Sequence, residues 1–169
     1  YDAVKDFTPV AMVAGTPNVL VAGAGVPATD MKSLVDYAKK NKVSYGSAGL
    51  GSLTHLAMEQ FRTAAGFEAV HAAYRGIGPA ITDVLGGQTQ MMMPGLAAAV
   101  PHIRAGKMKP IAVTGLKRHA LLPDTPTFGE AGHPQVAIDA YMGLLAPAGT
   151  PQPIIDKLHT EVAAILREK

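Results

Sequence analysis

The chain has 169 residues, of which 48% are hydrophobic and 17% are charged. This length and composition predict a folded domain of ordinary size with a real core, and they argue against disorder. The net charge is only +2, without a basic block or any Trp. Because nucleic-acid surfaces combine clustered positive charge with stacking rings, we expect no nucleic-acid partner. Cysteine is absent, which excludes disulfides and thiolate metal sites.

The two ends of the chain suggest that it is part of something longer. It opens on Tyr1 without the charged leader and apolar core of a signal peptide, and it stops at ILREK without a helix cap. We expect either a processed protein or a segment of one. No apolar run approaches the roughly 20 residues that span a bilayer.

Short apolar runs alternate with amphipathic stretches along the first half of the chain. Glycine, or a residue typical of helix N-caps, separates them, with Thr29 or Asp30 before one helix and Gly66 after the next. The pattern predicts strands at 8–14, 18–23, 42–46 and 68–73 and helices at 30–41 and 52–65.

The second half continues the alternation. Pro79 falls in the first turn of a helix bounded by glycines, and Pro101 disturbs another helix at 97–106. Strands are predicted at 89–93 and 110–115, a longer extended segment at 136–149, and a final helix from Pro151. The methionines at 91–93 are expected in the core of a buried strand.

Strands that alternate with helices predict an α/β fold built on a mostly parallel sheet flanked by helices. In such sheets the loops that follow the strands meet at the carboxyl edge, where ligands bind. The loops after the predicted strands are therefore the first places to search for a site.

One of these loops, YGSAGLGSLTHL (45–56), leads from a strand into a helix through three glycines. The first amides of a helix lack intrahelical partners and carry partial positive charge, and Ser47 and Ser52 add hydroxyl donors. The stretch fits a site for a carboxylate or a phosphate. It fits a plain tight turn with Ser52 as the N-cap equally well.

A second loop, YRGIGPAIT (74–82), has the same form and favours the anion site. It places Gly76 and Gly78 before another helix start, beside Tyr74 and Arg75. Two donor-rich helix ends on one sheet edge can hold two anionic groups, directly or through water. Arg75 is expected to be a solvated charge.

Enzyme motifs match this sequence poorly. A phosphate-binding P-loop needs Lys after its glycines, and a dinucleotide fingerprint needs a third glycine where Thr54 stands. A hydrolase elbow needs glycine two positions before its serine, where Tyr45 precedes Ser47. We expect His55 to pack and to hydrogen-bond the adjoining loop; the alternative is a hydrolytic or acyl-transfer enzyme that uses Ser47 or Ser52 with His55. No spacing of His and carboxylate residues indicates a metal site.

Taken in order, the motifs resemble one family, the periplasmic solute-binding proteins of tripartite tricarboxylate transporters, also called the Bug family. The resemblance runs through essentially the whole chain. It is carried by YDAVKDFTPVAMVA, YGSAGLGSLTHLA, YRGIGPAITDVLGGQ, IRAGKMKPIAVTG, KRHALLPDTPTFGEAG and GLLAPAGTPQPIIDKL.

The resemblance implies a non-enzymatic periplasmic protein, without cofactor or metal, whose two α/β lobes close on a small organic acid and deliver it to a membrane permease. It implies one lobe of a type II periplasmic-binding-protein fold. The ligand residues it implies are Ser47, Ala48, Gly49, Gly51 and Ser52 in the first loop and Tyr74, Gly76, Gly78, Pro79 and Ala80 in the second.

The same resemblance implies that much of a complete member is absent. Residues 1–7 are then a crossover segment, 8–140 the ligand-binding second lobe, and 141–169 a returning crossover strand and helix of the hinge or first lobe. Truncation would expose a surface through which the chain self-associates. Thr89 and Gln90 stand where Val and Asp are usual, so the acid itself is left open.

Overall fold

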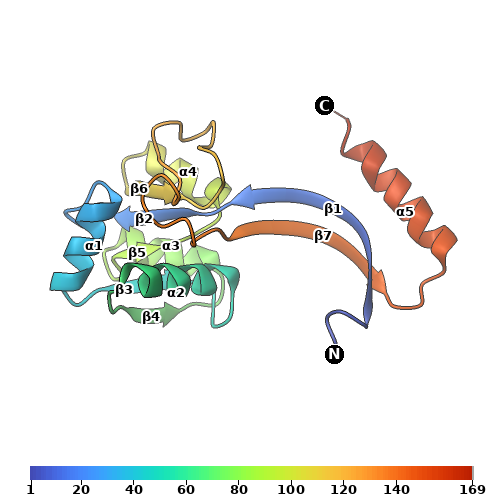
Figure 1. The fold of residues 1–169 in the computed structure, drawn as a ribbon, viewed down its shortest axis with the longest axis horizontal. Helices are drawn as coiled ribbons and strands as arrows, with labels where there is room; N and C mark the ends of the chain where they lie inside the picture. Colours follow the sequence, from blue (N-terminus) through green and yellow to red (C-terminus); the bar gives the residue numbers. More distant parts are fainter. Residues whose placement is uncertain (169) are drawn as a thin grey trace. The chain divides into compact units, whose positions relative to one another are not determined.

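The computed structural model describes residues 1–168, and the chain divides into two compact units. Unit 2 is the continuous stretch Thr16–Ala140, and unit 1 combines Tyr1–Gly15 with the residues from Tyr141 onward. Unit 2 holds both candidate loops (Figure 1).

Unit 2 is an α/β layer structure, as the sequence predicts. Its five-stranded sheet has the order β4-β3-β5-β2-β6. In chain order its elements are β2 (Val19–Gly23), α1 (Met31–Lys40), β3 (Ser44–Ser47), α2 (Leu53–Ala65), β4 (Val70–Ala73), α3 (Ile77–Leu85), β5 (Met91–Met92), α4 (Leu96–Arg104) and β6 (Met108–Val113).

The sheet is mixed: most strands run in one direction, as predicted, but β2 does not. β3 pairs in parallel with β4 and β5, whereas β2 pairs antiparallel with both β5 and β6. Four strands therefore share one direction and β2, inserted between two of them, runs opposite. Alternation of strands and helices does not reveal this reversal, because it does not record whether a helix returns the chain to the end of the sheet where the preceding strand began.

The helix ends follow the capping residues closely. Asp30 caps α1 and accepts a hydrogen bond from the amide of Ser33. The Ser33 hydroxyl in turn accepts from the amide of Asp30, which completes a capping box. Ser52 caps α2, and Gly66 closes it with φ of 68°. These predicted boundaries are confirmed within a residue. Pro101 is tolerated inside α4, where it is exposed.

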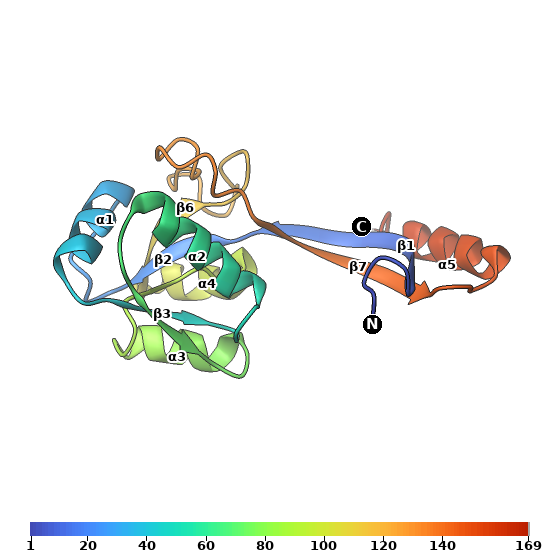
Figure 2. The same cartoon turned by 60° about the horizontal axis from the view of Figure 1, so that its bottom comes forward.

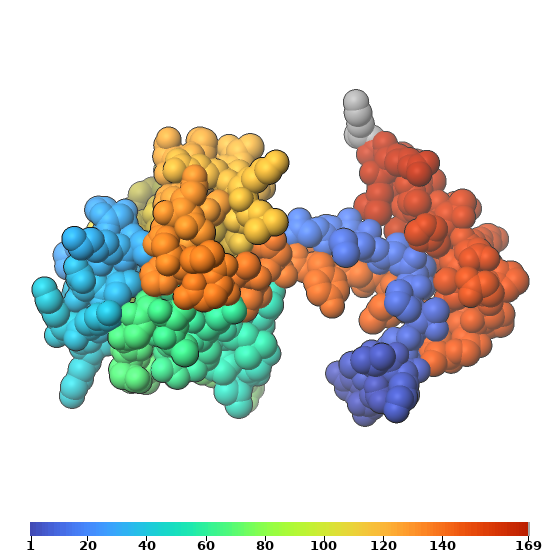
Figure 3. All heavy atoms as spheres, viewed as in Figure 1, coloured from blue at the N-terminus to red at the C-terminus, as the bar shows by residue number. Residues whose placement is uncertain are grey.

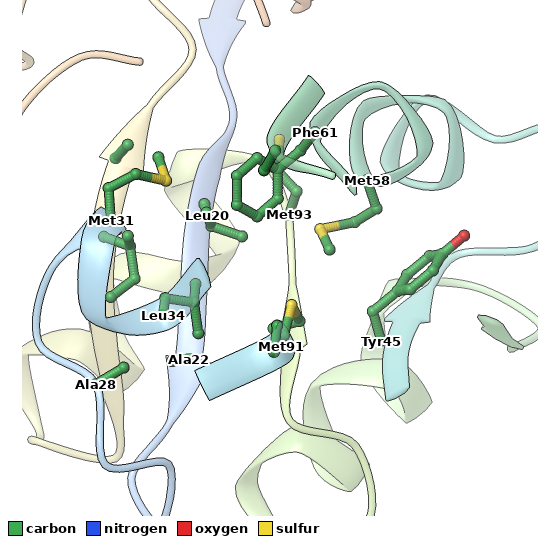
Figure 4. Packing of buried hydrophobic residues seen from close by; sticks show 14 of the residues in the cluster. Leu20, Ala22, Ala28, Met31, Leu34, Tyr45, Met58, Phe61, Met91 and Met93 are labelled. Atoms are coloured by element: carbon green, nitrogen blue, oxygen red, sulfur yellow. The ribbon is translucent and has the colours of Figure 1, made fainter. Parts of the chain in front are cut away.

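The core lies on both faces of the sheet. One cluster joins the sheet to α1 and α2 and includes Leu34, Phe61 and Met91, and the other joins it to α3 and α4. Figure 4 shows Met58 and Phe61 from α2 and Leu34 from α1 pointing toward the strands, and Figure 2 shows α2 and α3 on opposite sides. Met91, Met92 and Met93 are fully buried, as predicted, although only the first two are in β5.

Unit 1 contains most of a two-stranded ribbon and one helix. β1 (Phe7–Pro17) and β7 (Asp139–Pro147) form the ribbon and α5 (Gln152–Ile165) packs against it. The contact centres on Val10, Ala146 and Ile155, and His159 lies 2.7 Å from the carbonyl oxygen of Val10. In Figure 3 the atoms of α5 lie against those of β1. None of the helices in residues 1–168 is long and apolar enough to cross a membrane.

Candidate functional site

The two predicted loops lie side by side at one edge of the sheet. β3 and β4 are parallel neighbours whose last residues, Ser47 and Ala73, are paired, so the loops that follow leave the same edge. The amide of Tyr74 donates to the carbonyl of Ser47 at 3.1 Å, and the amide of Gly76 donates to that of Ala48 at 3.1 Å. Backbone hydrogen bonds thus join the two loops before their helices begin.

Gly49 is required at the closest approach of the loops. Its φ is 134°, a conformation that side chains other than glycine rarely adopt. A Cβ atom built there would lie 3.3 Å from the carbonyl oxygen of Tyr74. The glycine therefore permits both the turn and the contact with the second loop.

The first loop satisfies most of its own amides. The amide of Ala48 donates to Thr54 Oγ1 at 2.9 Å, and that of Gly49 to Ser47 Oγ at 3.2 Å. The amide of Gly51 donates to His55 Nδ1 at 3.1 Å, and that of Ser52 to the carbonyl of Gly49. Of the residues predicted here, Ser47 is fully buried, Ala48, Gly49 and Ser52 are half-buried and Gly51 is exposed. The loop presents a largely pre-ordered surface.

The start of α3 in the second loop differs, because nothing in residues 1–168 caps it through a side chain. Gly76 occupies the N-cap position with φ of 110° and ψ of 173° and offers no capping group. The next residues, Ile77 and Gly78, have their amides in the first turn, and Pro79 has none. Gly78 and Pro79 are exposed, whereas the Ala80 side chain is buried against the core.

Tyr74 braces the second loop. Its hydroxyl donates to Asp83 Oδ2 on α3 at 2.6 Å, and this bond raises the pKa of Tyr74 to about 12. Arg75 beside it is exposed, as expected for a solvated charge. The bond connects the residue after β4 to the second turn of α3.

Ser47 is paired with a different histidine from the one the hydrolase alternative requires. Its Oγ lies 2.6 Å from His71 Nε2, and it also hydrogen-bonds within the loop to Gly49. His55 instead packs and accepts the hydrogen bond from Gly51, which confirms the role expected for it. A fully buried serine engaged in these bonds is poorly placed to attack a substrate.

Several residues that shape the site escaped sequence reasoning. Thr54, His71 and Asp83 each hold a loop residue; Thr54 lies inside the first motif, whereas His71 and Asp83 lie outside both. A further pair, Glu59 and Arg62, supports them from behind: Glu59 accepts from the hydroxyl of Tyr45 at 2.6 Å and from Arg62 at 2.6 Å. Only the spacing of Glu59 and Arg62, one helical turn apart, is a signal in the sequence.

The pair also controls protonation in this region. The hydrogen bond from Arg62 lowers the pKa of Glu59 to about 2, against a smaller opposing effect of burial. Burial and the neighbouring Glu59 carboxylate raise the pKa of Tyr45. Burial, followed by the charge of His55, lowers the pKa of His71. The His71 imidazole and the Tyr45 phenol behind the first loop are therefore neutral, and Tyr45 donates to the ionised carboxylate of Glu59.

The model of one protein family, the tripartite tricarboxylate transporter family receptor, matches residues 1–168. The chain belongs to this family. Receptors of this family are non-enzymatic solute-binding proteins, which agrees with the buried, bonded Ser47. The resemblance given by the loop motifs is therefore confirmed.

Relatives of this receptor family extend well beyond the chain. A Pseudomonas protein encoded in a tcbD-tcbE intergenic region is 36% identical over 165 residues, which are 96% of this chain and 49% of the relative. The chain spans about half the length of the curated relatives it matches. It corresponds to part of a complete receptor.

Solved structures of receptors from this family share the fold. R. palustris Rpa4515 with adipate is 37% identical with a TM-score of 0.92, over 100% of this chain and 57% of that one. MatC (Rpa3494) from Rhodopseudomonas palustris with bound malate is 32% identical with a TM-score of 0.91, over 100% and 58%. The arginine-, lysine-, histidine-binding protein ArtJ from Geobacillus stearothermophilus, at 13% identity with a TM-score of 0.55 over 95% of this chain and 58% of that one, shares the fold alone, which is half of the type II periplasmic-binding-protein architecture.

Proposed function

We propose that this chain is the ligand-binding half of an extracytoplasmic receptor that captures a small organic dicarboxylate and presents it to a membrane permease. The observation that carries the proposal is the adjacency of two strand-to-helix loops, one pre-ordered and one with an uncapped helix start. Helix N-termini attract carboxylates through free amides and the helix dipole. The start of α3 offers free backbone amides, whereas most amides of the first loop are already hydrogen-bonded within that loop.

The contact residues of this proposal come from both loops. The amides at the start of α3 would hold one carboxylate, with the hydroxyl of Ser52 and the turn around Gly49 as the opposite wall. The proposed set is Ser47, Ala48, Gly49, Gly51, Ser52, Tyr74, Gly76, Gly78, Pro79 and Ala80, in which the buried Ser47 and Ala80 act by supporting the others.

The dicarboxylate class is supported by the ligands of two relatives. Rpa4515 contains adipate and MatC contains malate, and both are small acids with two carboxylates. With one carboxylate at α3, the second would face the half of the receptor that this chain does not contain. We therefore expect the chain alone to bind weakly.

The proposed organisation makes residues 1–7 a crossover segment, 8–140 the second lobe, and 141–169 a returning crossover strand and helix of the hinge or first lobe. The compact unit Thr16–Ala140 agrees with the C-terminal limit of this lobe, whereas residues 8–15 fall in the other unit. The periplasmic location and the permease partner rest on the family. Self-association of the chain stays a prediction, which sedimentation at several concentrations would test.

Calorimetric titration with matched acids tests the proposal. Adipate and malate should bind, the monocarboxylate hexanoate should bind more weakly than adipate, and adipamide, which has the same length without charge, should not bind. Equal weak heats for all of these ligands would contradict a carboxylate site. We expect dissociation constants near the millimolar range. A tenfold difference in affinity between two of these acids corresponds to about 1.4 kcal/mol.

A further inference from the structure

Two stacked imidazoles lie behind the first loop. The rings of His55 on α2 and His71 on β4 have centroids 4.0 Å apart and planes at 16°. Tyr45 on β3 also stacks with His71, with centroids 4.9 Å apart, and its ring centroid lies 6.4 Å from that of His55. Three consecutive elements, β3, α2 and β4, therefore meet at one aromatic stack.

Each imidazole holds one glycine of the loop. The amide of Gly51 donates to His55 Nδ1 at 3.1 Å. His71 Nε2 lies 2.6 Å from Ser47 Oγ, which in turn accepts from the amide of Gly49 at 3.2 Å. The stack thus contacts the loop at two points, one direct and one through Ser47.

We propose that His55 and His71 are positioning residues that order the first loop for its ligand, and that protonation of His55 releases the loop. The inference rests on the proposed function, because it gives the loop a role in carboxylate binding. The reason is chemical: Nδ1 accepts the Gly51 hydrogen bond only while it carries a lone pair, and the imidazolium has an N–H at that atom. Acidification therefore removes one tether.

The groups that face the stack set its charge. Glu59 and Arg62 face it from α2 and Tyr45 from β3, and Glu68 lies 3.5 Å from Arg62. The carboxylate of Glu59 attracts a proton to the stack, whereas burial and the charge of His55 lower the pKa of His71. His71 stays neutral where an ordinary histidine is charged, and the switch is assigned to His55 because its Nδ1 touches the loop amide directly.

Two substitutions separate the hydrogen bond from the titration. His55→Asn places Oδ1 near the position of Nδ1, so it keeps an acceptor that does not titrate, whereas His55→Ala removes the acceptor. Amide hydrogen exchange is followed at Gly51 between pH 8 and pH 6 and corrected for the intrinsic exchange rate. In the unmodified chain its protection should fall about fivefold on acidification, the equivalent of one neutral hydrogen bond. It should stay high in His55→Asn and low in His55→Ala.

Adipate supplies the second readout. Between pH 8 and pH 6 the affinity of the unmodified chain should fall about threefold more than that of His55→Asn, because an untethered loop must be ordered on binding. The titration of adipate itself affects both proteins equally. An affinity that rises on acidification only in the unmodified chain would overturn the inference, since His55 would then act as a charge for the ligand.

The two proposals fail in different ways. Gly51 protection that ignores pH, or that is equal in His55→Asn and His55→Ala, would overturn the positioning role whatever the chain binds. If the protection of the Gly51 amide changes with pH as predicted but adipate does not bind at any pH, the dicarboxylate proposal would fail and the hydrogen bond to His55 would be supported. His71→Gln, which keeps a group that can donate to or accept from Ser47 Oγ, should preserve Gly49 protection, and His71→Ala should lower it.

Discussion

The first and second loops of the candidate site use the same glycine-rich form with opposite outcomes. The first ends in a helix capped by Ser52 and fastened by Thr54, His55 and His71. The second ends in α3, where Gly76 provides no cap. A helix start that is satisfied from within the chain has less to offer a ligand than one left uncapped.

The difference assigns distinct tasks to two motifs that look equivalent in the sequence. In the proposed function the first loop supplies shape, because most of its amides are already hydrogen-bonded. The second supplies charge complementarity, because the first-turn amides of α3 and the helix dipole are available. Each prediction below removes one side of this contrast.

The largest effect is expected from a negative charge at the α3 end. Gly78→Asp places a carboxylate in the first turn, and a Cβ atom there meets no neighbour within 4 Å. The charge suits the helix but repels an acidic ligand, so adipate affinity should fall about 10- to 100-fold while stability is kept. Titration calorimetry and urea unfolding measure the two quantities.

The neutral variant Gly78→Asn is the matched control for size. It should bind adipate within about threefold of the unmodified chain, because it adds no charge. Such a change is under about 1 kcal/mol. Equal losses in both variants would mean that bulk rather than charge blocks the site, and α3 would lose its electrostatic role.

Loss of the α2 cap should act on stability more than on binding. Ser52→Ala removes the acceptor for the amide of His55 and should lower the free energy of unfolding by about 1 kcal/mol. Ser52→Thr keeps a hydroxyl and should recover most of it. Urea unfolding of the three proteins measures the order of their stabilities. An alanine variant as stable as the unmodified chain would show that the cap does not stabilise the fold.

Acid should weaken the support behind the first loop. The hydrogen bond from Arg62 lowers the pKa of Glu59 from 4.5 to about 2, so folding favours its ionised form. The contribution is therefore complete above pH 4.5 and is lost as the pH falls toward 2. Thermal melting between pH 5 and pH 2.5 should show a steeper loss in the unmodified chain than in Glu59→Gln. Parallel curves would contradict this assignment.

The smallest effect is expected from the brace of the second loop. Tyr74→Phe removes the hydrogen bond to Asp83 and should cost about 0.5 to 1 kcal/mol, because the bond is partly exposed. Asp83→Asn, which keeps an acceptor, should cost less. Chemical denaturation compares the stabilities of the two variants. An unchanged free energy of unfolding in Tyr74→Phe would show that this hydrogen bond does not stabilise the second loop.

The fold and the loops were predictable because they depend on local chemistry. Asp30, Ser52 and Gly66 mark helix ends through hydrogen bonds to residues nearby in the chain, and the burial of Met91 follows from its apolar run. The reversal of β2 was not, since strand direction depends on how the helix between two strands crosses the sheet.

The inner layer of the site was equally hidden. His71 meets Ser47 across 24 residues of sequence, and no periodic pattern marks such a contact. The unequal capping of the two helices was only partly predictable: Ser52 was predicted as the N-cap of its helix, whereas the structure alone shows Gly76 as the N-cap of α3. Sequence reasoning identified both loops but could not distinguish the roles that we propose for them.

The most direct test of the central claim is an amide NMR titration of this chain with adipate. The account predicts that the largest shifts fall on Ile77 and Gly78 at the start of α3, with smaller changes in residues 49–52, whose backbone is already fastened. Shifts concentrated in the first loop, with an unresponsive α3 end in a well-dispersed spectrum, would contradict the division of roles between the two loops.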